Sequence, residues 1–102
     1  MAILHTVNRS ASAGESLASC LRSAVSGSGV LLLEDGVYAA RAGGLGAQLL
    51  RCVNEQIQIY ALQADLQARG IAPAELLGRV QIVDYNGFVV LTCEYDKVLA
   101  WF

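Results

Sequence analysis

Three cysteines and one histidine are the residues of this sequence best suited to nucleophilic or redox chemistry. They are Cys20, Cys52, Cys93 and His5. A thiol becomes a nucleophile only when it is ionised, and its reactivity depends on its pKa and on access. An odd number of widely spaced cysteines predicts neither a disulfide framework nor a zinc site, so we expect no bound metal and a reducing compartment.

Cys20 is the strongest of the three candidates. Apolar residues at Leu17, Leu21 and Ala24 repeat with helical spacing, and a helical wheel places Cys20 at the flank of this stripe. We therefore expect a partly exposed thiol near a seam, with a small hydrophobe at a packing edge as the alternative. Cys52 and Cys93 lie in apolar helical segments, where we expect buried and unreactive thiols.

His5 and the acidic pair Glu34 and Asp35 could act as proton acceptors or donors. His5 falls inside a predicted buried strand, which favours a hydrogen-bonded structural histidine over a catalytic one. The acids follow the apolar run at residues 30–33, where capping and loop roles are more common than acid–base catalysis. The glycine-rich stretches at residues 27–29 and 43–46 lack the phosphate-binding and dinucleotide-binding patterns, so we expect no cofactor.

These candidates must be positioned by alternating strands and helices. The patterns predict strands at residues 2–7, 30–33, 56–61 and 80–83, helices at 17–25, 36–42, 46–54 and 61–69, and a helical turn at 73–77. Ser12 or Gly14 could cap the first helix. The alternation predicts an α/β fold, a three-layer α/β/α sandwich with a mainly parallel sheet and helices on both faces. Ligands bind such sheets at the carboxyl ends of the strands.

The C-terminal region allows two interpretations. The Asn86-Gly87 pair between apolar runs is typical of a hairpin over residues 80–93. Alternatively, Asp84 caps a helix, and residues 98–102 form a fifth strand. The regular alternation upstream favours the helix.

Composition restricts the possible partners. The 102 residues predict one domain spanning residues 1–102, and the 55% hydrophobic content exceeds what a monomer of this size needs. We therefore expect other subunits to cover part of the apolar surface. The net charge of −2 without Lys/Arg runs argues against direct nucleic-acid binding. The apolar runs are too short to span a bilayer, and no signal peptide is evident, so we expect a cytoplasmic protein.

Several segments together resemble the DsrH/TusB family of the DsrE/DsrF/DsrH-like sulfur-relay superfamily. They are residues 3–10 (ILHTVNRS), 16–21 (SLASCL), 33–40 (LEDGVYAA), 65–70 (DLQARG), 84–88 (DYNGF) and the final Ala100-Trp101. The resemblance runs nearly end to end. It implies a five-stranded α/β sandwich, which favours the helix at residues 84–95 and the strand at 98–102.

The resemblance also implies a function. Family members assemble with DsrE/TusD-like and DsrF/TusC-like subunits into a heterohexamer, which passes sulfur as a cysteine persulfide to a downstream acceptor protein. The Tus branch serves wobble-uridine thiolation of tRNA, and the Dsr branch serves sulfur oxidation. The main sulfur-carrying cysteine lies on the DsrE/TusD-type subunit. Cys20, in its Ser-Leu-x-x-Cys-Leu context, resembles the Dsr-type H subunits and is the candidate persulfide carrier of this chain. The alternative is a purely structural subunit.

Overall fold

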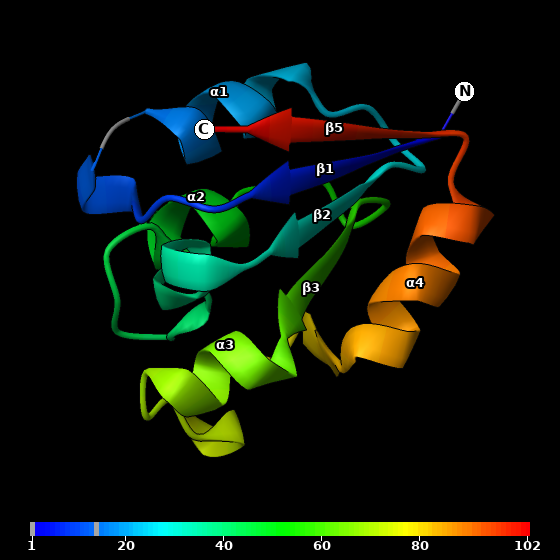
Figure 1. Cartoon of the computed structure of the whole chain (residues 1–102). Helices are drawn as coiled ribbons and strands as arrows, with labels where there is room; N and C mark the ends of the chain where they lie inside the picture. Colours follow the sequence, from blue (N-terminus) through cyan, green and yellow to red (C-terminus); the bar gives the residue numbers. More distant parts are fainter. Residues whose placement is uncertain (1, 14) are drawn as a thin grey trace.

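The computed structural model describes residues 2–13 and 15–102 and is built on a five-stranded parallel sheet with the order β4-β3-β2-β1-β5 (Figure 1). The strands are β1 (Ile3–Val7), β2 (Gly29–Leu32), β3 (Gln58–Leu62), β4 (Val80–Val83) and β5 (Lys97–Trp101). The α-helices are α1 (Ser16–Ser23), α2 (Ala47–Arg51), α3 (Gln63–Ala68) and α4 (Tyr85–Glu94). Short 3₁₀ helices are η1 (Ala11–Ala13), η2 (Glu34–Ala40) and η3 (Pro73–Glu75). The predicted sandwich with a five-stranded parallel sheet is confirmed.

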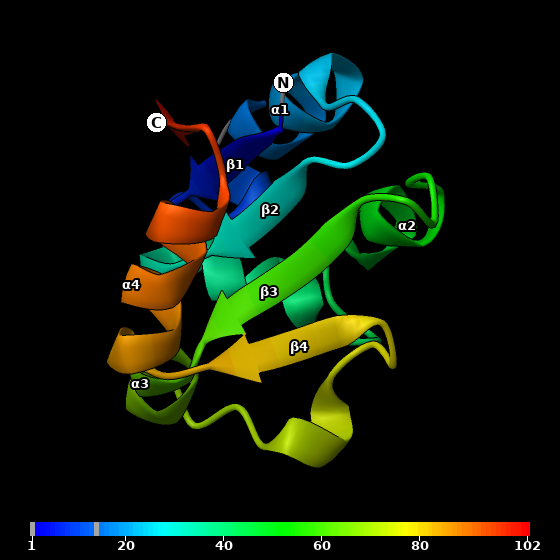
Figure 2. The same cartoon turned by 90° about the vertical axis from the view of Figure 1, so that its right-hand side faces the viewer.

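The helices lie on two faces of the sheet because the last strand is added at the opposite edge from the strands before it. From β1 to β4 each new strand is added on the same side, and the connecting helices cover one face. The last connection returns to the other side of β1, and a right-handed crossover then requires α4 to cross the opposite face. Figure 2 shows α4 on one side of the sheet and α1 and α2 on the other.

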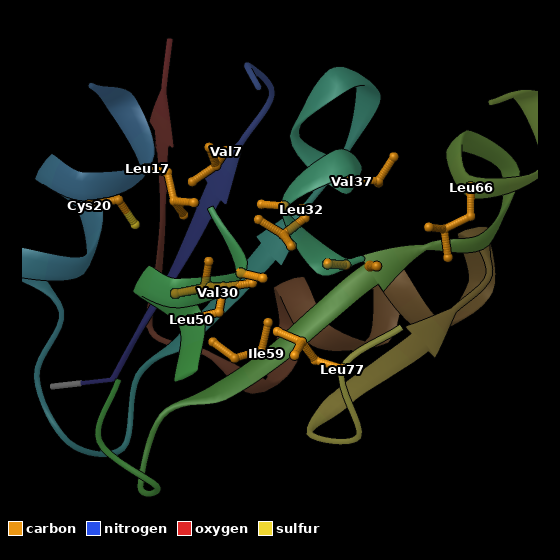
Figure 3. Packing of buried hydrophobic residues seen from close by; sticks show 14 of the residues in the cluster. Val7, Leu17, Cys20, Val30, Leu32, Val37, Leu50, Ile59, Leu66 and Leu77 are labelled. Atoms are coloured by element: carbon orange, nitrogen blue, oxygen red, sulfur yellow. The ribbon is translucent and has the colours of Figure 1, made fainter. Parts of the chain in front are cut away.

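Two apolar clusters fill the space between these layers. The larger one joins β1, β2 and β3 to α1, η2, α2 and α3, and Figure 3 labels its main members, among them Val7, Leu17, Val30, Leu32, Leu50, Ile59 and Leu66. The smaller one lies under α4 and consists of Leu4, Leu31 and Leu91, with partly buried residues around them. All four residues of β2 are buried, as expected for a strand that is covered on both faces.

The C-terminal region follows the helical interpretation, and the hairpin interpretation is wrong. The Asp84 Oδ1 atom accepts a hydrogen bond of 2.8 Å from the Gly87 backbone N–H, which caps α4. Leu91 is buried against the sheet, and Phe88 and Tyr95 pack around the same cluster. β5 then pairs in parallel with β1. Packing and capping together outweigh the local turn preference of Asn86-Gly87.

Some local predictions differ from the structure. The α1 N-cap is Glu15, which makes no side-chain capping bond, so the predicted cap at Ser12 is wrong. The other predicted cap, Gly14, lies outside the described residues. The predicted helix at residues 36–42 is the 3₁₀ helix η2, which begins at Glu34. The predicted helix at residues 46–54 contracts to α2. Leu45, which precedes this segment, and Leu49, which lies within it, are exposed.

Arg79 explains how the segment after α2 is held. Its guanidinium donates hydrogen bonds of 2.7–3.1 Å to the carbonyls of Leu50, Val53, Asn54 and Ile57. A charged donor satisfies these carbonyls in place of a longer helix.

Across the described part of the chain, none of the helices is long and apolar enough to cross a membrane.

Candidate functional site

Cys20 is fully buried, so the prediction of a partly exposed thiol is wrong. Its relative exposure is 0%, and Figure 3 shows its side chain pointing from α1 into the larger cluster near Leu17. Cys20 and Leu17 are three residues apart, which places both on the buried face of α1. Burial raises the pKa of the Cys20 thiol from 9.0 to about 12. The thiol in this conformation is therefore protonated and inaccessible.

Cys52 and Cys93 are exposed, which contradicts the prediction that both are buried. Cys52 is the C-cap of α2 and lies past the last helical residue. Cys93 lies one turn after Val89, which is 60% exposed, on the outward side of α4. The apolar sequence around Cys93 suggested burial, but the sheet covers only the opposite side of this helix.

His5 is buried and hydrogen-bonded, as predicted. It is 2% exposed, and its Nδ1 atom accepts a hydrogen bond of 3.0 Å from the Trp101 indole N–H. An accepting Nδ1 requires the neutral imidazole. Burial lowers the His5 pKa below 6.5. Trp101 packs against the larger cluster, whereas Phe102 after it is 78% exposed.

We expect the His5–Trp101 contact to make stability depend on pH. The folded state holds the histidine neutral with a pKa below 6.5, so the unfolded chain binds more protons as the pH falls. The stabilisation is complete above pH 6.5 and is lost as the pH falls through the pKa of the folded state. Urea denaturation at pH values from 7.5 to 5 measures this loss. In His5→Gln, which keeps an acceptor for Trp101, the free energy of unfolding should depend less steeply on pH. Equal slopes would contradict the prediction.

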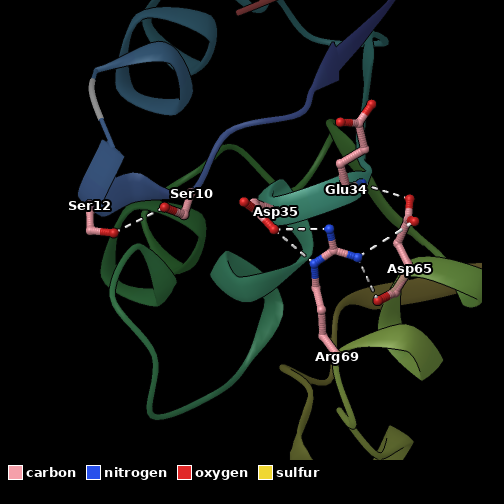
Figure 4. Close-up of polar contacts among 6 residues, drawn as sticks. All are labelled: Ser10, Ser12, Glu34, Asp35, Asp65 and Arg69. Carbon is pink, nitrogen blue, oxygen red and sulfur yellow. Dashed lines mark hydrogen bonds and ion pairs between the residues drawn. The ribbon is translucent and has the colours of Figure 1, made fainter.

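A polar group lies at the carboxyl end of the sheet, where β1, β2 and β3 deliver their following segments. We call Ser10, Ser12, Glu34, Asp35, Asp65 and Arg69 the strand-exit cluster (Figure 4). The Arg69 Nε and Nη2 atoms both lie 2.9 Å from Asp35 Oδ1, and Arg69 Nη1 lies 3.6 Å from Asp65 Oδ1. The Arg69 guanidinium thus joins the exit of β2 to α3.

Glu34 has a left-handed backbone, with φ of 50°. Its N–H donates a hydrogen bond of 2.6 Å to Asp65 Oδ2, which holds this turn in place. Such conformations cost roughly 1–3 kcal/mol in a residue other than glycine and are enriched at functional sites. The sequence patterns did not identify Asp65 and Arg69 as site residues. Their opposite charges at i,i+4 spacing on a helix could have indicated that they pair.

The structure does not combine the sequence-predicted candidates into one reactive site. Among the described residues, no cysteine shares a hydrogen bond or ion pair with the strand-exit cluster. No group of three or more His, Cys, Asp or Glu side chains in residues 2–13 and 15–102 could hold a metal ion. The cluster offers hydroxyls and carboxylates, which suit ligand binding better than nucleophilic attack, and its guanidinium is already paired with Asp35 and Asp65.

Comparison with known proteins gives full-length matches. A family model described as "DsrH like protein" matches residues 9–98. "Protein TusB" of Serratia proteamaculans (strain 568) is 37% identical over 99 residues, covering 97% of this chain and 100% of that protein. "Protein TusB" of Shigella flexneri is 39% identical, with the same coverage.

Two solved structures share the fold. The ychN protein from E. coli superposes with a TM-score of 0.78 at 22% identity and covers 97% of each chain. MTH1491 from Methanobacterium thermoautotrophicum gives a TM-score of 0.74 at 14% identity, over 96% of this chain and 97% of that one.

Proposed function

Because this chain belongs to the DsrH/TusB family, we propose that it is a subunit of a cytoplasmic sulfur-relay complex. The observation that carries the proposal is the end-to-end match to TusB proteins, at 37–39% identity over 97% of this chain. The proposed partners are DsrE/TusD-like and DsrF/TusC-like subunits in a heterohexamer, which hands persulfide sulfur to an acceptor protein. The TusB relatives support tRNA wobble-uridine thiolation as the pathway, and the sulfur-oxidation branch indicated by Cys20 stays a prediction.

Within this complex we propose a structural and interaction role for the chain. Cys20 is buried and has a raised pKa, so it presents no thiolate for attack on a sulfane sulfur. A carrier role for Cys20 requires α1 to open. With α1 closed, as in the structure, a cysteine of a partner subunit carries the persulfide.

Exposed apolar side chains support the interaction role. On α4 they are Tyr85, Val89 and Val90, and on β5 they are Val98 and Leu99, each between 45% and 61% exposed. The only charged residue of α4 is Glu94, the last residue of the helix. A helix that is apolar on both sides is typical of one that is covered in an assembly.

The decisive experiment measures intact mass after exposure to a persulfide donor. The chain is assembled with its partner subunits, and the wild type is compared with Cys20→Ser. We expect a gain of one sulfur atom on a partner subunit and none on this chain. Cys52→Ser is a matched control for an exposed thiol. A gain on this chain that disappears only in Cys20→Ser would instead make Cys20 a carrier.

The pathway is tested separately in cells. Deleting the gene for this chain should lower 2-thiolation of wobble uridine, and the Cys20→Ser variant should restore it. Unchanged thiolation in the deletion strain would contradict the proposed pathway. Failure of Cys20→Ser to restore thiolation, with the complex intact, would contradict the structural role.

A further inference from the structure

A small cavity adjoins the strand-exit cluster. Its volume is about 230 Å³, and its polar lining comes from Ser10, Ser12, Asp35, Tyr38 and Arg41. The cavity lies where the segments after β1 and β2 leave the sheet, the usual position of ligand sites in open parallel sheets. The volume is below the roughly 300–1,000 Å³ of sites for drug-sized ligands, so it suits a ligand of only a few heavy atoms.

Two oppositely charged side chains line this cavity, and each has polar atoms without a partner among the described residues. Asp35 uses only its Oδ1 atom for Arg69, and within the described residues its Oδ2 atom has no partner. The Asp35 side chain is 62% exposed. The Arg41 guanidinium lies 5.6 Å from the centre of the Tyr38 ring and has no ion pair or side-chain hydrogen bond within the part of the chain described. The Ser10 and Ser12 hydroxyls lie 3.0 Å from each other.

We propose that this cavity binds a small zwitterion, a free α-amino acid with a short side chain. Asp35 accepts hydrogen bonds from the ammonium group, and Arg41 donates to the carboxylate. The serine hydroxyls can donate to or accept from either group. The Asp35 carboxylate would repel a simple anion, and the Arg41 guanidinium would repel a simple cation. A zwitterion satisfies both charges, and this assignment does not depend on the proposed sulfur-relay function.

The test is a titration of the ¹⁵N-labelled full-length chain with glycine and L-serine, followed by amide chemical shifts. We expect saturable shifts at residues 10–12 and 35–41 with a Kd on the order of 1 mM. N-acetylglycine lacks the ammonium group and glycinamide lacks the carboxylate, so each should bind at least about tenfold more weakly. Equal binding of either analogue, or no saturable shift up to about 10 mM amino acid, would overturn the proposal.

Substitutions separate ligand contacts from structural effects. Asp35→Asn and Arg41→Gln should each weaken binding at least about tenfold. Arg69→Gln removes the same ion pair as Asp35→Asn but keeps the Asp35 carboxylate, so it should retain binding. Glu55→Gln, an exposed residue outside the cavity, is the matched surface control. Unchanged binding in Asp35→Asn, or equal loss in Asp35→Asn and Arg69→Gln, would show that the carboxylate does not contact the ligand.

Discussion

Cys20 should be alkylated at least about a thousand times more slowly than an accessible thiol of ordinary pKa. The shift in its pKa from 9.0 to about 12 lowers the thiolate fraction near pH 8 by about three powers of ten. Its complete burial adds a barrier of access. Time-resolved mass spectrometry with iodoacetamide measures the alkylation rate of each cysteine. Cys52 and Cys93 serve as exposed references in the same chain.

Denaturation provides the control for this prediction. In concentrated urea the three cysteines should react at similar rates, because burial no longer distinguishes them. If Cys20 reacts in the native chain as fast as Cys52, then α1 opens readily and the thiol is available as a carrier. The same measurement in the assembled complex shows whether partner subunits change the access to Cys20.

The errors about the thiols have a common physical cause. The periodicity of α1 identified its apolar side, but the wheel left the rotation of the helix uncertain, and Cys20 stood at the flank of the stripe. The sequence of α4 is apolar on both sides, so periodicity could not indicate which side meets the sheet. The exposure of Cys93 depends on this choice, which only the tertiary packing determines.

The architecture was more predictable than the site. The buried run that became β2, the alternation of strands and helices, and the Asp84 cap are local signals, and the structure agrees with each. The pairing of Asp35 with Arg69 joins residues 34 positions apart, and the left-handed turn at Glu34 depends on Asp65 from another element. Hydrophobic patterns specify strands and helices, but they do not specify polar contacts between segments distant in sequence.

The exit of β2 should be very sensitive to substitution at Gly36. An alanine Cβ at this position would collide with the carbonyl oxygen of Val7. That oxygen accepts a hydrogen bond of 3.0 Å from the Leu33 N–H, so the backbone of β1 cannot move aside without breaking this contact. We expect Gly36→Ala to lower the free energy of unfolding by about 3 kcal/mol or more, out of a total of roughly 5–15 kcal/mol for a domain.

Gly43→Ala is the matched control, because a Cβ at Gly43 meets no atom within 4 Å and its backbone is not left-handed. It should change stability by less than about 0.5 kcal/mol. Urea denaturation measures both variants, and equal m-values would show that the denatured states are comparable. Because Gly36 directly follows Asp35, a partly folded Gly36→Ala variant should also lose the Asp35–Arg69 ion pair. Equal stability of the two variants would show that β1 and the β2 exit are not packed as closely as the structure indicates.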